Sequence, residues 1–460
     1  MVITTFKYDE LFDEIPKIVV EPPGPKAKVI IEKNYKYVSR LQMGISKILQ
    51  VVFDKAYGAV VQDVDGNVYI DFTAAVTTNN TGHTHPKVAQ AIKEQSEKFL
   101  HAYEYPTQVR ADVAELLAKL APIKSSEVRV IFSNCGTEAN ENALRIAEQY
   151  TGKHEIISFW ESYHGKTRGS ASITTWNVKI RKGLKVVGNM LSVPYPDCNH
   201  CFLKHKYPDC GLACFDFLDY VKEYQSTDDI AAVIIEPVLG GGCTYPPKEW
   251  MKALREWTTE NNVLFIDDEV QAGFGRTGKF FAIEHFDVEP DIITGGKGLA
   301  SGLPASATII RKEYEDAMVN EYGGLYTSTF GGNPIAMAAA KASLEVYIEE
   351  KLPEHAAEVG EHIMKRLNEE IKPKYDFLGY IQGKGLLIGI EFVTKDGKPD
   401  KKIPLKAVEK AFKKGLLIFT TGHKGNFLKI CPPLVITKEL ADKGLDVLDE
   451  VFAEIKKEMT

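Results

Sequence analysis

A single lysine stands among glycines directly after an apolar run. Asp291-Ile292-Ile293-Thr294 leads into Gly295-Gly296-Lys297-Gly298-Leu299. Lysine normally keeps its charged amine in water. If this lysine is held out of water, desolvation lowers its pKa, and the neutral amine can form a Schiff base with a carbonyl group. The alternative is an exposed lysine in a turn.

A second segment places acidic residues at the end of an apolar run. Val263-Leu264-Phe265-Ile266 is followed directly by Asp267, Asp268 and Glu269. A carboxylate at the end of a buried strand costs free energy unless it meets a partner, and a protonated ring nitrogen would be such a partner. The alternative is that Asp267 caps a loop.

A third segment joins an apolar run to a helical pattern. Phe132 is followed by Ser133-Asn134-Cys135-Gly136-Thr137, and the helix is expected to begin near Thr137. The start of a helix offers free backbone N–H groups and the positive end of the helix dipole, and both suit a phosphate. Gly136 would let the backbone approach the phosphate, and the Thr137 hydroxyl would add a donor. The alternative is an ordinary helix cap.

The elements around these segments predict the fold. Buried strands are expected at residues 128–132, 155–159, 231–235, 263–266 and 307–310, and helices at 137–150 and 248–261. Apolar strands that alternate with helices indicate an α/β fold with a mostly parallel sheet covered on both faces. Ligands of such sheets bind outside the carboxyl ends of the strands, which is where the three segments lie.

The two ends of the chain differ from its middle. Residues 1–71 contain a proline-rich arm, which we expect to be extended, and then two short β-type runs around Asp65-Gly66-Asn67, which predicts a hairpin. Residues 346–460 combine helical patterns with strands expected at 386–393, 416–419 and 427–430. We therefore expect a large domain over residues 72–345 and a smaller α+β domain formed by residues 1–71 and 346–460.

A Schiff-base lysine, a carboxylate for a ring nitrogen and a phosphate cradle are together what pyridoxal 5'-phosphate (PLP) requires of a protein. The sequence also resembles the class III (ω-type) aminotransferases of fold type I over nearly its whole length. The matching motifs include Gly82-His83-Thr84-His85-Pro86, Asn134-Cys135-Gly136-Thr137-Glu138, Tyr163-His164-Gly165, Ile235-Glu236-Pro237 and Thr329-Phe330-Gly331-Gly332-Asn333-Pro334. The most diagnostic motif is Asp268-Glu269-Val270-Gln271, which runs into Gly273-Phe274-Gly275-Arg276-Thr277-Gly278.

The resemblance implies a role for each matching residue. Lys297 would hold the cofactor and move the substrate proton, and Asp268, rather than Asp267, would pair with the ring nitrogen. Tyr163 would stack on one face of the ring and Val270 would pack on the other. The full set of cofactor-binding residues implied is Cys135, Gly136, Thr137, Tyr163, His164, Glu236, Asp268, Val270, Gln271, Lys297 and Thr329. In this family Thr329 reaches the phosphate of the neighbouring subunit, which implies a homodimer with shared active sites.

The sequence departs from the family at three positions. Cys135 stands where a serine is usual. Gly241 and Lys429 stand where members that use glutamate carry a glutamate and an arginine that grips a substrate carboxylate. Neither partner has a purpose without the other. We expect an aminotransferase that moves an amino group from an amine or ω-amino acid to a keto acid such as pyruvate, because transamination is the commoner activity of the family. The alternative is an amino acid racemase or epimerase on the same scaffold, while the intact Lys297 and Asp268 oppose a non-catalytic scaffold.

The composition excludes several classes of protein. The 460 residues contain 56 Lys plus Arg against 63 Asp plus Glu, which gives a formal net charge of -7. The chain therefore has no excess of positive charge with which to bind nucleic acid or an anionic membrane. No apolar run approaches transmembrane length, and the acidic residues among the first sixteen do not suit a signal peptide. We expect a cytoplasmic enzyme that acts on small molecules.

Four of the seven cysteines form a cluster, Cys198-x2-Cys201-x8-Cys210-x3-Cys214, within residues 195–216. Thiolates at such spacings can bind a structural zinc ion. Free thiols and two disulfides are the alternatives. Nothing in the sequence places this cluster at the cofactor, so we predict no metal ligand in the active site.

Overall fold

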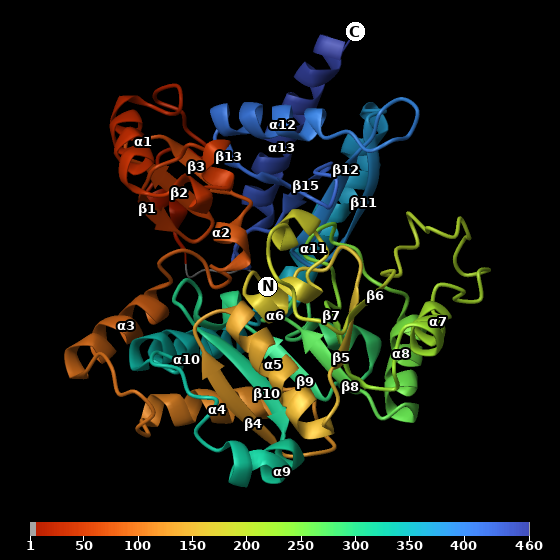
Figure 1. Cartoon of the computed structure of the whole chain (residues 1–460). Helices are drawn as coiled ribbons and strands as arrows, with labels where there is room; N and C mark the ends of the chain where they lie inside the picture. The colour runs from red at the N-terminus through yellow and green to blue at the C-terminus, as the bar shows by residue number, and fades with distance from the viewer. Residues whose placement is uncertain (1–5, 460) are drawn as a thin grey trace. The chain divides into compact units, whose positions relative to one another are not determined.

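The computed structural model describes residues 6–459 of the chain (Figure 1). The chain divides into two compact units, one formed by the residues up to Pro86 together with those from Glu350 onward, and one formed by Lys87–Glu349. The sequence placed boundaries near residues 71 and 345. Each unit has sheets of its own and is described separately below.

The unit of residues 87–349 is built on a seven-stranded sheet with the order β4-β10-β9-β8-β7-β5-β6. Its strands are β4 (Val128–Ser133), β5 (Glu155–Phe159), β6 (Met190–Val193), β7 (Ile230–Ile235), β8 (Leu264–Asp268), β9 (Ile292–Gly295) and β10 (Ser306–Arg311). Neighbouring strands are parallel except at β10, which is antiparallel to both β4 and β9. Every residue of β5 and β7 is buried, as expected for strands covered on both faces. The predicted α/β fold with a mostly parallel sheet is confirmed.

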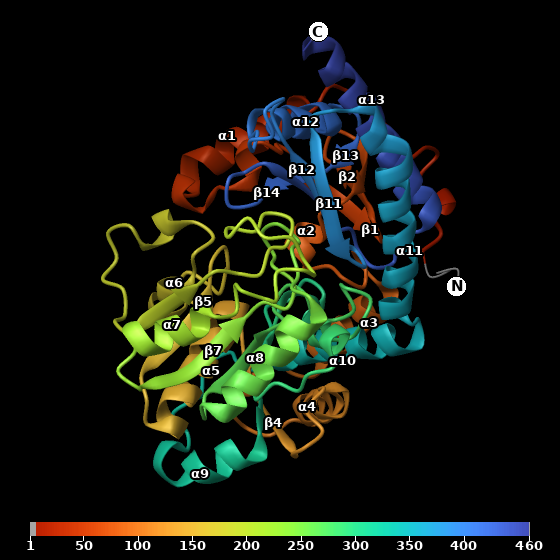
Figure 2. The same cartoon turned by 90° about the vertical axis from the view of Figure 1, so that its right-hand side faces the viewer.

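Helices cover this sheet (Figure 2). They are α3 (Pro86–Lys98), α4 (Gln108–Leu120), α5 (Gly136–Thr151), α6 (Arg168–Ile173), α7 (Phe217–Tyr224), α8 (Lys248–Glu260), α9 (Lys312–Tyr322) and α10 (Pro334–Glu349). The buried side of α5, with Ala143, Leu144 and Ala147, packs on apolar residues of β5, β7, β8 and β9 in one core. Packing against the sheet therefore holds the start of α5 near the carboxyl ends of the strands.

The five strands predicted for this unit match β4, β5, β7, β8 and β10, with ends that differ by at most two residues. Two further strands, β6 and β9, were not predicted as strands. Each has only four residues, which is too short to show a period of its own. Both are strands because a neighbour in the sheet pairs with them, β5 with β6 and β8 with β9.

The second unit contains two four-stranded sheets, with the orders β1-β2-β3-β13 and β11-β12-β15-β14. The strands are β1 (Phe53–Tyr57), β2 (Val60–Asp63), β3 (Val68–Asp71), β11 (Leu378–Lys384), β12 (Leu387–Phe392), β13 (Leu416–Leu417), β14 (Phe419–Thr421) and β15 (Phe427–Ile430). The predicted hairpin is present as the antiparallel pair β2–β3. Strand β13 pairs in parallel with β3, so the first of these sheets combines N-terminal and C-terminal segments. The strand expected at 416–419 is in fact two strands, which belong to different sheets.

The helices of this unit are α1 (Pro25–Tyr37), the short turn α2 (Ala74–Thr77), α11 (Leu352–Arg366), α12 (Lys402–Lys413) and α13 (Lys438–Met459). Helix α1 begins directly after the proline-rich arm, in a stretch for which the sequence predicted no helix, and Pro25 stands at its first position, where proline is favoured. The carboxylate of Asp65 caps this helix, accepting hydrogen bonds from the N–H groups of Lys26 and Ala27, both at 2.8 Å. A cap supplied from 39 positions away leaves no signal in the local sequence.

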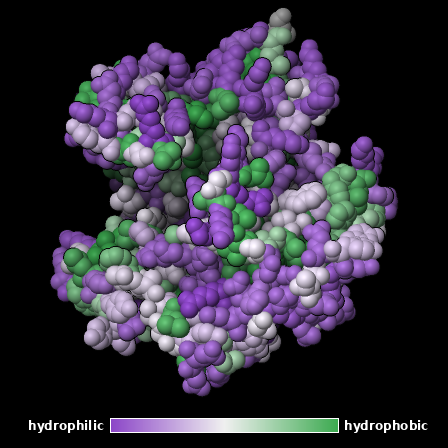
Figure 3. All heavy atoms as spheres, viewed as in Figure 1, coloured by the Kyte–Doolittle hydropathy of each residue, from purple (hydrophilic) through white to green (hydrophobic). Residues whose placement is uncertain are grey.

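The surface that Figure 3 shows is mostly hydrophilic, with apolar side chains in separate patches. Across residues 6–459, no helix combines the length and the apolar character that crossing a membrane requires.

Candidate active site

The end of β8 carries the carboxylate that was predicted to face a ring nitrogen. The Oδ2 atom of Asp268 accepts a hydrogen bond from Nδ2 of Asn140 at 2.8 Å and lies 2.7 Å from Nδ1 of His164. The N–H of Val270 donates to the other oxygen at 3.0 Å. These contacts fix the plane and direction of the buried carboxylate.

Its neighbour Asp267 is in a different environment, because consecutive side chains of a strand point to opposite faces of the sheet. Asp267 is fully buried on the same side as Glu269. Burial, together with the nearby Glu269, raises the pKa of Asp267 well above its ordinary value, and burial raises the pKa of Glu269 to about 8. Burial therefore favours the protonated form of both groups, which makes Asp267 less suited than Asp268 to face a cation.

Glu236, the residue after β7, connects two loops of the site. Its Oε1 accepts a hydrogen bond from the N–H of Tyr163 at 2.7 Å, and its Oε2 accepts one from the N–H of Gly240 at 2.8 Å. Burial raises the pKa of Glu236 and also that of Tyr163. Glu236 thus positions the loop that carries Tyr163 and His164, which follows β5.

The start of α5 forms a narrow backbone cradle. A Cβ atom at Gly136 would lie only 2.4 Å from Cγ1 of Val270, and one at Gly296 would lie 3.4 Å from the backbone N of Gly136. Glycine is therefore required for this close approach. Cys135 is the N-cap residue of α5, and Thr137 forms a hydroxyl contact of 2.7 Å with Ser170. The first N–H groups of a helix have no carbonyl partner within it, so this cradle suits a phosphate.

Lys297 follows β9 and begins a short 3-10 helix, Lys297–Ala300. Its φ of 41° lies in the left-handed region, which non-glycine residues rarely adopt and which costs about 1–3 kcal/mol. The surrounding structure holds this conformation: the N–H of Leu299 donates to the carbonyl of Gly296 at 2.9 Å, and the Tyr347 hydroxyl donates to the carbonyl of Gly298 at 2.5 Å. The adjacent Gly296 contacts the cradle, so Lys297 lies beside it.

Gln271 and Thr329 complete the set of predicted residues. Gln271 is half-buried, and its Oε1 occupies the place of a Cβ at Gly240, since the two atoms would be 1.8 Å apart. Thr329 lies on an exposed turn before α10. Of the eleven predicted residues, the structure thus gathers ten at the carboxyl ends of β4, β5, β7, β8 and β9, while Thr329 is exposed.

Asn140 is a site residue to which the sequence assigned no role. Its side chain donates to both Asp268 and the carbonyl of His164, the latter at 2.7 Å, and its own oxygen accepts from the Thr294 hydroxyl at 2.6 Å. The available signal was an asparagine on the buried face of a helix, where a polar group needs partners. Its partners come from three other segments, so only the fold identifies them.

The arrangement fits PLP on its own geometry. A backbone cradle that a Cβ would fill, a buried carboxylate oriented by three groups and a strained lysine beside them meet at one edge of a mostly parallel sheet. These features define a PLP-dependent enzyme of fold type I.

Comparison with known proteins gives the family. Residues 43–452 match the family described as aminotransferase class-III, and the chain belongs to this family, whose cofactor is PLP. The chain is 39% identical to the alanine/serine racemase of Pyrococcus horikoshii over 98% of this chain and 95% of that protein. It is 37% identical to the isoleucine 2-epimerase of Lentilactobacillus buchneri (94% and 96%) and 40% identical to the acetylornithine aminotransferase of Methanothermobacter thermautotrophicus (88% and 94%). A solved aminotransferase of Bacillus anthracis is 32% identical, with a TM-score of 0.86 over 93% of this chain and 99% of that one.

Proposed function

We propose that this enzyme removes and returns the α-proton of an amino acid with an uncharged side chain, and so acts as a racemase or epimerase. The observation that carries the proposal is the environment of Gly241. A Cβ at this position would lie 3.0 Å from Cδ1 and 3.4 Å from Nε1 of Trp176, so the indole already takes the space that a longer side chain needs. The Tyr163 and Trp176 rings meet edge-on, with centroids 6.2 Å apart. Aromatic side chains therefore lie where members of the family that use glutamate carry the charged glutamate side chain.

A glutamate–arginine pair serves an enzyme that must accept two different substrates in turn, one with and one without a second carboxylate. A racemase handles a single amino acid and needs no such switch. Lys429, which stands in place of the arginine, is 2% exposed on β15, with Nζ 6.0 Å from the centre of the Phe419 ring. A lysine offers a point charge, but it cannot form the two parallel hydrogen bonds by which an arginine holds a carboxylate. Gly241 and Lys429 therefore support the assignment as a racemase or epimerase. A racemase and an epimerase among the relatives support it as well.

In this proposal the chain's own residues act as follows. Lys297 would hold the cofactor covalently, and its Nζ, once released, would take the α-proton from one face of the α-carbon. When bound, PLP supplies an electron sink for the negative charge left at the α-carbon. Asp268 would stabilise the positive charge of the ring nitrogen, and Asn140 and His164 keep its carboxylate in place. The start of α5 and the Thr137 hydroxyl would hold the phosphate, and Tyr163 and Val270 would pack against the ring. Inversion requires that the returned proton reach the α-carbon on the face opposite Lys297, from a second acid or from solvent.

We also propose a homodimer with shared sites, in which the exposed Thr329 binds the phosphate held by the other copy. Light scattering of the purified protein tests the dimer. Loss of cofactor affinity in Thr329→Ala, with the dimer retained, tests the shared site.

Transamination is the second candidate, because the acetylornithine aminotransferase and the solved aminotransferase are also close to this chain. The two functions are separated by incubating the holoenzyme with single L-amino acids in D2O, without a keto acid. We expect α-deuterium incorporation and loss of optical activity while the cofactor spectrum persists. Stoichiometric conversion of the cofactor to its aminated form, reversed by a keto acid, would instead identify an aminotransferase.

A further inference from the structure

The connection between β6 and α7, residues 194–216, contains turns but no helix or strand. Irregular segments longer than about 12–15 residues are uncommon in compact domains and usually have a function or a device that orders them. The four clustered cysteines, Cys198, Cys201, Cys210 and Cys214, all lie in this connection. The cofactor site uses none of them.

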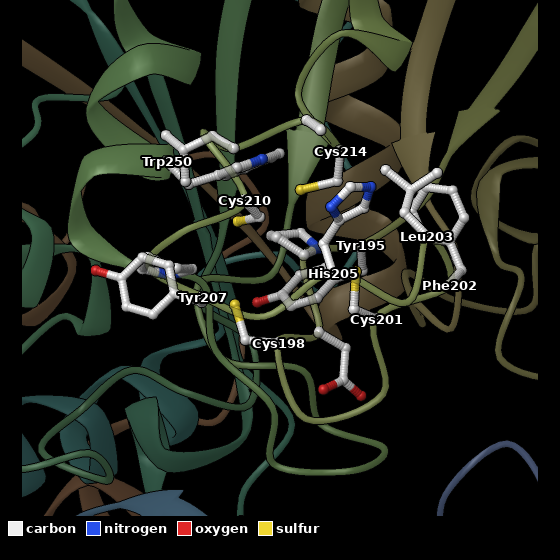
Figure 4. A pocket seen from close by; sticks show the side chains of 15 residues that line it. Tyr195, Cys198, Cys201, Phe202, Leu203, His205, Tyr207, Cys210, Cys214 and Trp250 are labelled. Atoms are coloured by element: carbon white, nitrogen blue, oxygen red, sulfur yellow. The ribbon is translucent and has the colours of Figure 1, made fainter.

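The four thiols line one cavity, shown in Figure 4, which Tyr195, Tyr207 and Trp250 also line. They come from two turns of the chain. In the first, Oδ1 of Asp197 accepts the N–H groups of Asn199 (3.0 Å) and His200 (3.1 Å), which fixes the turn between Cys198 and Cys201. In the second, the N–H of Ala213 donates to the carbonyl of Cys210 at 3.2 Å. Each turn presents two sulfur atoms to the same space.

The walls of the cavity are anchored to the domain. The Phe215 and Trp250 rings meet edge-on at 5.6 Å, and the Tyr207 hydroxyl donates to Oε1 of Glu249 at 2.6 Å. The Tyr195 hydroxyl donates to the carbonyl of Glu236 at 3.1 Å. No disulfide joins the two turns, because all four thiols are free. As the side chains now lie, no three His, Cys, Asp or Glu groups within residues 6–459 surround a point where a metal ion would fit.

We propose that Cys198, Cys201, Cys210 and Cys214 bind one structural zinc ion, which joins the two turns and orders the connection. Four sulfur donors and no open position are typical of a structural zinc site. Binding gathers the sulfur atoms by rotation of their side chains and a shift of the two turns. The four thiols release four protons to the solvent and form four Zn–S bonds, with no change of oxidation state. Two disulfides would instead require an oxidant to accept four electrons.

The test is the zinc content of the holoenzyme, expressed with added zinc and purified under reducing conditions without chelator. Elemental analysis should find about one zinc ion per chain. The double variant Cys198→Ser/Cys201→Ser should retain less than about a tenth of it, because two ligands do not hold the ion. Cys243→Ser is the matched control, since Cys243 is buried but does not line the cavity, and it should keep the full zinc content.

Two measurements that do not depend on activity accompany the metal analysis. Release of zinc from the wild type by a mercurial reagent should make residues 194–216 sensitive to proteolysis, and this holds even if the double variant fails to fold. Titration of thiols in denatured, metal-free protein should find all seven cysteines free. Protein without bound zinc would overturn the proposal, as would equal zinc in the double variant. Only three titratable thiols, seven less the four of the cluster, would show two disulfides instead.

Discussion

The adjacent residues Asp267 and Asp268 allow a matched test of the site, because the same substitution can be made at each. In Asp268→Asn, the amide keeps one acceptor oxygen and gains an NH2 group. If the oxygen stays with Asn140, the NH2 faces the N–H of Val270, which loses its 3.0 Å hydrogen bond. A buried donor left without a partner costs about 1–3 kcal/mol of stability. Loss of the charge beneath the ring nitrogen should lower kcat by about 10²–10³, the usual effect of removing one preorganised electrostatic group.

In Asp267→Asn the substitution replaces a carboxyl group whose pKa burial and Glu269 raise well above its ordinary value. An amide is similar in size to a protonated carboxyl group, so we expect kcat to change by less than about threefold and stability by less than about 1 kcal/mol. Initial rates at saturating PLP and urea unfolding measure the two effects separately. Equal losses of kcat in the two variants, or an unchanged kcat in Asp268→Asn, would show that the assignment of the carboxylates is wrong.

Three further predictions concern other parts of the site. Lys297→Ala should abolish turnover and leave no cofactor covalently attached after borohydride reduction, as mass spectrometry of the chain will show; retained turnover would contradict its role. Gly241→Glu should lower kcat/KM for apolar amino acids at least about tenfold, because the new side chain displaces Trp176; Gly241→Ala, with its smaller clash, is the control, and an unchanged kcat/KM would contradict the packing argument. Because the pKa of Glu269 is raised from 4.5 to about 8, its contribution to stability is present below pH 4.5 and is lost as pH rises to about 8. Relative to the wild type, Glu269→Gln should therefore gain stability from pH 5 to pH 8.5 in urea unfolding, and a constant difference would exclude the raised pKa.

The fold of the large unit was readable from the sequence because its central strands are continuous apolar runs. Strands such as β7 bury every residue, so their pattern does not depend on their neighbours. The short strands β6 and β9 and the helix α1 were missed for the opposite reason. Their structure depends on pairing or capping by distant residues, as Asp65 shows at the start of α1.

The choice between Asp267 and Asp268 also depends on residues that are distant in the sequence. Composition and spacing are equal for two adjacent aspartates, and the resemblance to a family selected Asp268. The physical reason is the register of the sheet: Asp268 pairs with Thr294 on β9, and the hydroxyl of Thr294 holds Asn140, which donates to Asp268. Because side chains alternate along the strand, the side chain of Asp267 lies on the other face of the sheet, on the same side as Glu269.

The glycines after β7 bear on substrate specificity. In the sequence, Gly241 was identified only as a departure from the family at the position of a glutamate. In the structure, Gly240 is required because Oε1 of Gln271 takes the place of its Cβ, and Gly241 is constrained because Trp176 lies against it. The loss of a charged residue at position 241 is therefore coupled to a bulky aromatic residue 65 positions earlier. Restoring glutamate alone should not restore the use of a dicarboxylic substrate, because the indole must also be removed. Gly241→Glu combined with Trp176→Ala, assayed with glutamate beside each single variant, tests this coupling, and a gain in the single Gly241→Glu variant would contradict it.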